Sequence, residues 1–324
     1  MSVADGPFAD ALGAFTGLEH VVPVGRASLG IAAVLLAFRG QGTLKVAVSA
    51  AVCQDVIAAV LLAGASPLLC DVELETGLVP SSEWIRARAA GARAAIVVHL
   101  YGNAAETSEV RRIFAAPDCL VLDDAAQALG ARSSTGLAGA EGDVGIYSFG
   151  PTKHIEVGGG ALCFSDAGLA AESRVALASL GVSPTSEVEA AQQRFRSGLN
   201  LARETLRAGP QTEIRPFAGL LTGYEAALRV EWRPEWGPLI ARALRAFPEA
   251  LERRRETAEA WGEIALAAGL VPVGMGLSPA TRSVCAPWRF ACRLPGADWA
   301  SQHVVGERLR STGLNVSHWY LPGH

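Results

Sequence analysis

The sequence lacks the patterns that mark several large classes of protein. Its six cysteines are scattered and none forms a CxxC pair, so neither a zinc site nor a disulfide framework is indicated. The net charge is only −4, and the one arginine triplet, 253–255, lies among glutamates, which is typical of a solvated helix face. We therefore expect no metal and no nucleic-acid partner.

No apolar run is long enough to suggest a membrane span, although half of the residues are hydrophobic. The most apolar stretch, 46–70, is interrupted by Gln54 and Asp55. We interpret it as the strand, helix and strand of a buried α/β unit. Residues 1–5 contain neither a basic segment nor a long apolar one, so we expect no signal peptide and no membrane partner. A cytoplasmic protein is the expectation.

Short apolar runs alternate with helical stretches along the first two-thirds of the chain. We expect strands at 46–48, 67–70, 95–98, 120–122, 145–149 and 161–164. We expect helices between them at 28–39, 53–63, 81–90, 105–116 and 167–179. Fully apolar strands separated by helices predict an α/β fold with a mostly parallel sheet covered on both faces. In such a sheet the functional residues gather at the carboxyl ends of the strands.

The last third has a different pattern. Residues 186–258 are expected to be helical, with breaks at the prolines, namely Pro210, Pro216, Pro234, Pro238 and Pro248. After them we expect strands at 271–273, 287–293 and 316–320, and a helix at 299–311. The chain is long enough for two domains. We predict a large α/β domain over 1–235 and a small α+β domain over 236–324.

Two residues point to the chemistry of pyridoxal 5'-phosphate (PLP). Lys153 ends the run 148–153 just after an expected strand, and Asp124 follows another strand about one βα unit upstream. A lysine amine can form an imine with the aldehyde of PLP, and a carboxylate can keep the ring nitrogen protonated so that the ring withdraws electrons. The amine must be neutral to react, so we expect its surroundings to lower its pKa. The alternatives are an exposed loop lysine and an aspartate that caps a helix.

At these residues the sequence resembles the DegT/StrS family of PLP-dependent sugar-nucleotide aminotransferases. The segments that carry the resemblance occur in the family's order at 64–72, 98–103, 124–127, 148–153 and 222–227. Each motif alone is weak, but several in order are specific, and the likeness runs from about residue 24 to 324. It implies the aspartate-aminotransferase-like fold (PLP-dependent transferase fold type I). It also implies an amino-acid donor, glutamate foremost, and a keto group on a nucleotide-linked sugar as acceptor.

The resemblance also implies residues that hold the cofactor. Gly25, Arg26 and Ala27 stand at the family's "GTxA" turn, where backbone N–H groups at a helix N-terminus bind the phosphate, although arginine replaces the threonine. Ser148 would bind the same phosphate. Gln127, on the same helical side as Asp124, would bond near the phenolic oxygen; an ordinary surface glutamine is the alternative.

Three features depart from the family's pattern. Cys53 stands where an aromatic residue often stacks on the cofactor ring; a sulfur can cover a ring face, and a core cysteine is the alternative. Arg215 lies in the family's "NYR" loop, but the asparagine is missing, so Arg215 would replace it as the contact to the cofactor of a neighbouring subunit. The small domain is short by family standards. His99 is expected along the cofactor face, and His154 receives no role.

The resemblance implies a homodimer with each active site at the subunit boundary. The segment 213–224 and an apolar helix over 220–228 are the expected isologous contact. Two other functions stay open. One is a different reaction on the same fold, such as sugar dehydration, although a dehydratase of the family would lack the lysine that this chain has. The other is a PLP-binding regulator without turnover, which the departures from the family's pattern leave possible.

Overall fold

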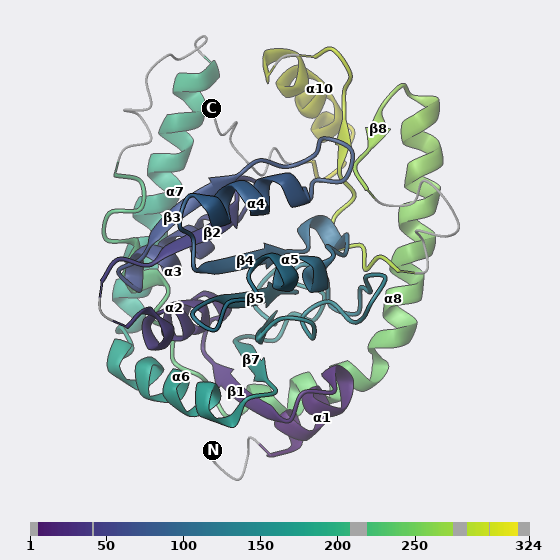
Figure 1. Cartoon of the computed structure of the whole chain (residues 1–324). Coiled ribbons are helices and arrows are strands. Elements are labelled where there is room, and N and C mark those ends of the chain that lie inside the picture. The colour runs from purple at the N-terminus through teal and green to yellow at the C-terminus, as the bar shows by residue number, and fades with distance from the viewer. Residues whose placement is uncertain (1–5, 41, 208–218, 275–283, 298, 317–324) are drawn as a thin grey trace.

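The computed structural model describes residues 6–40, 42–207, 219–274, 284–297 and 299–316 (Figure 1). A seven-stranded sheet of order β1-β7-β6-β5-β4-β2-β3 lies at its centre. The strands are β1 (His20–Val24), β2 (Lys45–Ser49), β3 (Ser66–Cys70), β4 (Ala94–Val98), β5 (Leu120–Asp124), β6 (Val144–Ser148) and β7 (Gly160–Phe164). β3, β2, β4, β5 and β6 run parallel, whereas β7 is antiparallel to both β6 and β1. The prediction of a mostly parallel sheet is confirmed.

All six strands expected in the first two-thirds of the chain are present, but β1 was not predicted. Its sequence carries Pro23, which removes a backbone donor, and proline is tolerated in sheets mainly on edge strands. β1 is such an edge strand, because it pairs only with β7. Pro23 argued against a strand in the sequence, but the edge position of β1 tolerates the missing backbone donor.

Helices cover both faces of the sheet, as the apolar strands predicted. They are α1 (Gly6–Thr16), α2 (Ala27–Arg39), α3 (Gln54–Leu62), α4 (Ser81–Ala89), α5 (Thr107–Ile113) and α6 (Ala167–Leu180). α2, α3 and α6 pack on one face, where alternate strand residues such as Ile96 and Leu122 are buried. α4 and α5 pack on the other, over Val97 and Val121. Each such side chain contributes about 1.5–3 kcal/mol by leaving water, so both faces hold the sheet in place.

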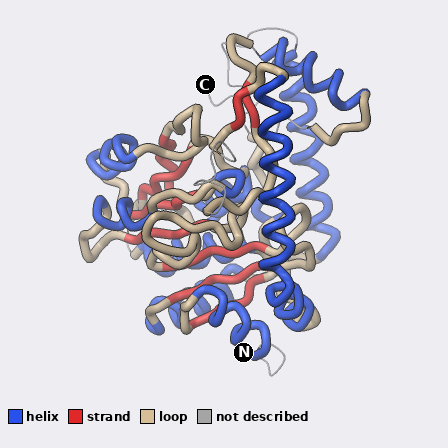
Figure 2. The backbone as a smooth tube through the Cα atoms, turned by 90° about the vertical axis from the view of Figure 1, so that its right-hand side faces the viewer, coloured by secondary structure: helices blue, strands red, loops and turns tan. Residues whose placement is uncertain are grey.

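The rest of the chain is mostly helical. Its elements are α7 (Thr185–Arg207), the 3-10 helix η4 (Tyr224–Ala227), α8 (Trp236–Ala267), β8 (Val271–Pro272), β9 (Cys292–Arg293) and α10 (Trp299–Ser311). α8 packs with α1 at one end and reaches β8 at the other (Figures 1 and 2). The helix expected at 299–311 is confirmed as α10, and the strand expected at 271–273 is β8, which pairs with β9 in a separate two-stranded sheet.

Several expectations for this last third were wrong. α8 does not break at Pro238 or Pro248. Pro238 lies in the first turn, where no intrahelical donor is needed, and buried neighbours such as Phe247 and Leu251 hold the helix together around Pro248. Instead of the helix expected at 220–228, turns lead into the short η4. Of the strand expected at 287–293, only Cys292–Arg293 is a strand.

The strand expected at 316–320 lies almost entirely outside the described residues. Among the helices within the described ranges, none combines the length and the apolar character that crossing a membrane requires.

Candidate active site

The candidate residues gather at one edge of the sheet. β1 runs in the same direction as β6, because both are antiparallel to β7, so the carboxyl ends of β1, β2, β4, β5 and β6 share this edge. Asp124 is the last residue of β5 and Ser148 the last of β6. His99 follows β4 directly, and Arg26 follows β1 by two residues. The predicted gathering at the carboxyl edge is therefore what the topology produces.

Lys153 lies in a closed loop after β6. The Phe149 N–H donates to the Gly159 oxygen (2.9 Å), while the N–H groups of Val157 and Gly158 both donate to the Phe149 oxygen (2.9 and 2.7 Å). The two glycines have positive φ angles, 143° and 72°. A Cβ on either would come within 3 Å of the ring of Trp236 or Trp232. Because the glycines are packed against these rings, the loop has little freedom to move.

Burial and charge act on the Lys153 amine in opposite directions. Burial lowers the pKa of this amine below its ordinary 10.5, against the opposing influence of Cys53, Asp124 and Asp55. Burial also raises the pKa of the Asp124 carboxyl above 3.8, and the Ala126 N–H and Lys153 oppose that rise. The amine and the carboxyl thus sit close enough to influence each other in a site of low polarity. The expected lowering of the lysine's pKa is confirmed.

Asp124 is buried, with 4% of its surface exposed. Its Oδ1 accepts a hydrogen bond from the Ala126 N–H at 3.0 Å, and no described residue donates to its Oδ2. Residues 125–130 form turns, so Asp124 does not cap a helix, and the alternative reading of this residue is excluded. Oδ2 is the acceptor that the site leaves available for a bound N–H group.

The neighbouring Asp123 serves the structure of the loops. It accepts from Thr107 Oγ1 (2.7 Å), from the N–H groups of Gly139 and Glu141 (2.9 Å each) and from His99 Nε2 (2.7 Å). Burial works to raise the pKa of Asp123, but His99 and these hydrogen bonds lower it below its ordinary value. The carboxylate therefore stays charged and holds the loops after β4 and β5 together.

His99 is fully buried, and both of its ring nitrogens are used. Nδ1 accepts from the Ala105 N–H at 2.8 Å, so the ring proton must be on Nε2, which donates to Asp123. Both nitrogens of His99 are therefore hydrogen-bonded within the protein, and the ring face is the part of this residue that stays a predicted contact to a cofactor.

The side chain of Arg26 is engaged within the chain. Its Nη2 and Nε donate to Asp55 Oδ2 at 2.6 and 3.0 Å, and its Nη1 donates to the Ala227 oxygen at 3.2 Å. The Tyr224 hydroxyl donates to Asp55 Oδ1 at 2.6 Å. This network ties the start of α2 to α3 and η4. Asp55 and Tyr224 were not expected in the site, because no pattern in the sequence pairs them with Arg26.

The N-terminus of α2 offers a place for an anion. In the sheet, Ser148 pairs with Gly160, which in turn pairs with Val24, so the three lie side by side. A Cβ on Gly160 would be 3.0 Å from the Ala27 nitrogen. The Ser28 hydroxyl, in the first turn, is buried and has no hydrogen-bond partner. An unpaired hydroxyl beside free helix N–H groups and Ser148 suits a phosphate.

Gly25, Cys53 and Gln127 have well-defined surroundings. A Cβ on Gly25 would lie 1.9 Å from the Val230 oxygen, so only glycine fits there. Cys53 precedes α3, and burial, reinforced by Asp55, raises the pKa of its thiol to about 12, which keeps it neutral. Gln127 is buried in a turn, not on the expected helix, and its Oε1 accepts from the Tyr101 N–H at 3.0 Å. The surface-glutamine alternative is thus excluded.

His154 and Trp288 join the lysine loop to a segment far away in sequence. His154 Nε2 lies 3.0 Å from the Ala286 oxygen, and burial lowers the pKa of His154 to about 3, with Arg254 acting in the same direction. A neutral His154 therefore donates to that oxygen. Trp288 places its ring centroid 5.1 Å from the Lys153 Nζ. Neither residue had an expected role, because nothing local in the sequence links residue 288 to residue 153.

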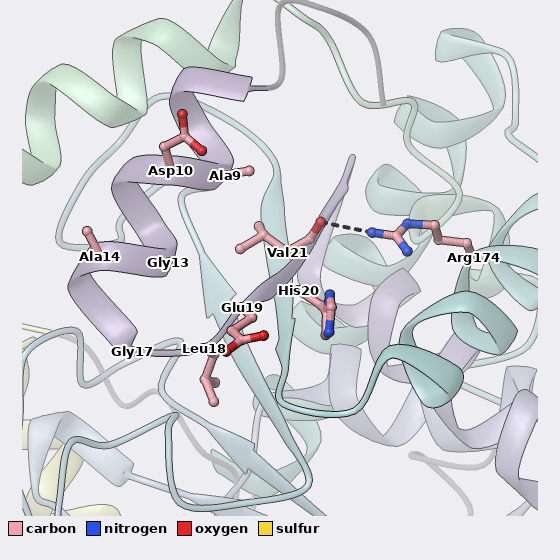
Figure 3. A pocket seen from close by; sticks show the side chains of 10 residues that line it. All are labelled: Ala9, Asp10, Gly13, Ala14, Gly17, Leu18, Glu19, His20, Val21 and Arg174. Carbon is pink, nitrogen blue, oxygen red and sulfur yellow. Dashed lines mark hydrogen bonds between the residues drawn. The ribbon is translucent and has the colours of Figure 1, made fainter.

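Arg215 falls outside the described residues, so its expected contact stays a prediction. A surface cavity of about 450 Å³ lies between α1 and the start of β1, lined by Asp10, Glu19, His20 and Arg174 among others (Figure 3). His20 begins β1, whereas the candidate site is at the carboxyl end of that strand, so this cavity belongs to the opposite edge of the sheet.

The residues present fit PLP. An amine of lowered pKa, a buried carboxyl with an available oxygen and an anion cradle at a helix N-terminus are the three groups that its aldehyde, ring nitrogen and phosphate require. Among the described residues, no cluster of His, Cys, Asp and Glu is arranged to hold a metal ion.

Comparison with known proteins places this chain among related sequences and folds. A profile of the DegT/DnrJ/EryC1/StrS aminotransferase family matches residues 5–208. The chain is 31% identical to the lipopolysaccharide biosynthesis protein RfbH of Salmonella typhimurium over 169 residues, which are 50% of this chain and 39% of that protein. It is 28% identical to an L-glutamine:2-deoxy-scyllo-inosose aminotransferase of Streptomyces paromomycinus, over 97% of this chain and 69% of that protein.

Among solved structures, the putative sugar aminotransferase Spr1654 of Streptococcus pneumoniae in its PLP form matches with a TM-score of 0.74. The match covers 99% of this chain and 78% of that one at 15% identity. At this identity the likeness shows the fold, and the predicted aspartate-aminotransferase-like class is confirmed.

Proposed function

This chain belongs to the DegT/DnrJ/EryC1/StrS aminotransferase family, and we propose that it is a PLP-dependent aminotransferase. It would move an amino group from an amino acid, glutamate foremost, to a keto group of a nucleotide-linked sugar. The observation that carries the proposal is the pair formed by Lys153 and Asp124 at the carboxyl edge of the sheet, a buried amine of lowered pKa near a buried carboxyl with an available oxygen.

PLP, when bound, supplies an aldehyde for the lysine and an electron-withdrawing ring. The chain's own residues do the rest. Burial disfavours the charged form of Lys153 Nζ, so this amine would be better able to react with the aldehyde and to carry a proton afterwards than an exposed lysine would. Asp124 Oδ2 would accept the ring N–H. A charge-assisted bond of this kind is strong in a dry site.

The other site residues would hold and cover the cofactor. The N–H groups at the start of α2, from Gly25 through Ala27, would bind its phosphate together with the hydroxyls of Ser28 and Ser148. In this arrangement Arg26 contributes its backbone, because its guanidinium already binds Asp55. Cys53 and Gln127 would contact the ring side, and the neutral Cys53 thiol suits an apolar face.

The substrate, the assembly and the domain division are parts of the same proposal. The chain spans 39% of RfbH and 69% of the inosose aminotransferase, so their activities do not transfer to it as whole proteins. The keto-sugar acceptor, a homodimer with Arg215 as a donor to the neighbouring cofactor, and a cytoplasmic location rest on the family resemblance. The division into 1–235 and 236–324 would place the boundary at the start of α8.

Two alternatives are weaker. Sugar dehydration would be expected in a relative that lacks the lysine, and Lys153 is present with a lowered pKa. A PLP-binding regulator without turnover has no specific observation in its favour, since Asp124, Ser148 and the start of α2 are all in place.

A half-reaction tests the proposal. The purified protein is loaded with PLP, and glutamate is then added while the absorbance near the visible edge is followed. We expect the band to bleach and 2-oxoglutarate to form in equal amount. Lys153→Ala is the matched control and should show neither change. A protein that binds PLP through Lys153 but stays inert to every amino donor would refute the aminotransferase and favour the regulator.

A further inference from the structure

A short segment at 284–288, here called the strap, runs across the loops at the carboxyl edge of the sheet. The Val284 oxygen accepts from the Arg132 N–H (2.7 Å), and the Ala286 N–H donates to the Gly102 oxygen (2.9 Å). The Trp288 N–H donates to the Tyr101 oxygen (3.0 Å), and its Nε1–H donates to the Thr152 oxygen (2.5 Å). The strap thus binds the loops that follow β4, β5 and β6.

Trp288 bonds to the two strained residues of these loops. Tyr101 and Thr152 have φ angles of 59° and 67°, and they are the non-glycine residues with positive φ among those described. Non-glycine residues in this conformation persist only where surrounding contacts hold them. The carbonyl groups of both residues accept hydrogen bonds from Trp288, and Thr152 directly precedes Lys153. One side chain therefore stabilises the turn that presents the lysine.

The indole also lies over the lysine itself. Its centroid is 5.1 Å from Lys153 Nζ, and Trp288 is only 6% exposed. The Arg289 guanidinium lies 4.8 Å from the same ring. A ring in this place keeps water from the amine, which disfavours the charged form. The face of the ring also attracts a cation at this distance, and this smaller effect favours the charged form.

We propose that Trp288 is the positioning residue for Lys153: it holds the Thr152–Lys153 turn in its left-handed conformation and covers the amine from water. The importance of this placement for catalysis rests on the proposed function, because it assumes that Lys153 is the reacting group. The hold on the turn and the cover over the amine do not depend on it. The charged and titratable groups that act on this amine are Asp124, Cys53, Asp55, Arg26 and His154, and Arg289 lies against the same indole ring.

Two substitutions separate the two tasks of the indole. Trp288→Phe keeps a ring over the amine but removes the Nε1–H donor to Thr152. Trp288→Ala removes both and admits water. Trp261→Phe and Trp261→Ala are the matched controls, because Trp261 is partly exposed on α8 and the site does not include it.

The first measurement uses the protein without cofactor. Reductive methylation by formaldehyde and cyanoborohydride modifies only neutral amines, so its rate at Lys153 as a function of pH, followed by peptide mass spectrometry, reports the pKa of this amine. We expect Trp288→Ala to raise that pKa by roughly one unit, because the admitted water would stabilise the charged form more than the ring face does. Trp288→Phe should leave it near the wild-type value.

The second measurement is hydrogen exchange of the peptide that covers residues 149–158. Loss of the bond to Thr152 should speed exchange roughly fivefold in Trp288→Phe, the effect expected for one hydrogen bond. In the PLP-loaded enzyme both Trp288 substitutions should lower kcat with little change in KM for glutamate. The substitutions misplace the Lys153 amine but do not remove a residue expected to bind glutamate.

The outcomes decide the proposal. If Trp288→Ala leaves the pKa of Lys153 and the loop exchange like those of Trp261→Ala, Trp288 does not position the lysine. If Trp288→Ala does not fold, Trp288→Phe decides alone, and exchange at the wild-type rate overturns the hold on the turn. A wild-type protein without transamination would refute the proposed function but would not alter either measurement on Lys153.

Discussion

Asp124→Asn should separate the chemical role of Asp124 from its effect on stability. The amide keeps an oxygen for the Ala126 N–H, which donates to Oδ1 at 3.0 Å, so the local turn should survive. The amide's NH₂ group would then face the ring nitrogen and could only donate to it. PLP would still bind, but its ring nitrogen would not be held protonated, and the ring would withdraw electrons poorly.

The rate should fall steeply. Loss of a charge placed to stabilise the transition state in a dry site costs about 4 kcal/mol, which corresponds to about a thousandfold in rate. Stopped-flow measurement of the glutamate half-reaction, with the cofactor saturating, gives this number directly. A variant that turns over at nearly the wild-type rate would mean that another acid holds the ring, and our assignment of Asp124 would be wrong.

The same substitution should make the cofactor-free protein more stable, although it lowers the rate. Burial raises the pKa of Asp124 in the folded protein, so the folded state holds this proton more tightly than the unfolded state does. Stability is then lost as the pH rises from the unfolded pKa through the folded one. Above the folded pKa the wild type carries this penalty in full, so in that pH range Asp124→Asn, which has no charge to bury, should unfold at a higher urea concentration.

Asp123→Asn is the matched control for this experiment. Asp123 lies one residue away, but it accepts hydrogen bonds from four groups of the surrounding loops. An amide cannot accept at both ends, and each donor left without a partner costs about 1–3 kcal/mol. We expect this variant to lose stability, in contrast to Asp124→Asn, when both are unfolded in urea at the same pH.

Four further predictions concern the lysine, the arginine network and the subunit boundary. Lys153→Ala should abolish the absorbance of the lysine-bound cofactor without unfolding the protein, and borohydride reduction of the wild type should place the pyridoxyl group on Lys153; label on another lysine would contradict the assignment. The rate of PLP uptake should rise with pH to a midpoint below 10.5, because burial lowers the pKa of the attacking amine, and a midpoint at or above 10.5 would contradict this cause. Asp55→Ala should cost about 2 kcal/mol in urea unfolding, since it strips a partly buried Arg26 of its partner at 2.6 Å, and should weaken PLP binding at the adjoining start of α2; unchanged stability would show that water replaces the carboxylate. If the protein is a dimer with shared sites, Arg215→Ala mixed with Lys153→Ala should recover part of the activity, and a proven heterodimer without recovery would exclude Arg215 as the shared contact.

Local sequence determined most of the sheet and the two principal residues of the site. Short runs of apolar residues make buried strands wherever helices cover both faces, so the six expected strands appear where the pattern placed them. Asp124 and Lys153 could be found because each follows such a strand, and parallel strands bring their carboxyl ends to one edge. The spacing of residues along the chain was enough for this, since each step depends on neighbours a few positions away.

The long-range contacts were decided by the tertiary structure alone. α8 passes through Pro248 because apolar side chains on both sides of it, Phe247 and Leu251 among them, pack into the core, and this packing outweighs one lost hydrogen bond. The family resemblance placed Arg26 at the phosphate, but its guanidinium binds Asp55, 29 residues later. Such contacts leave no periodic trace in the sequence.

Trp288 shows most clearly that a local sequence pattern does not predict long-range contacts. In the sequence it reads as part of a strand, whereas in the folded chain its backbone and indole hold loops nearly 190 and 136 residues away, at Tyr101 and Thr152. The local pattern of the sequence reports what a residue prefers to bury, but not against which partner. That partner depends on how the sheet and α8 bring distant segments together, so the lysine was determined by the sequence and its cover only by the fold.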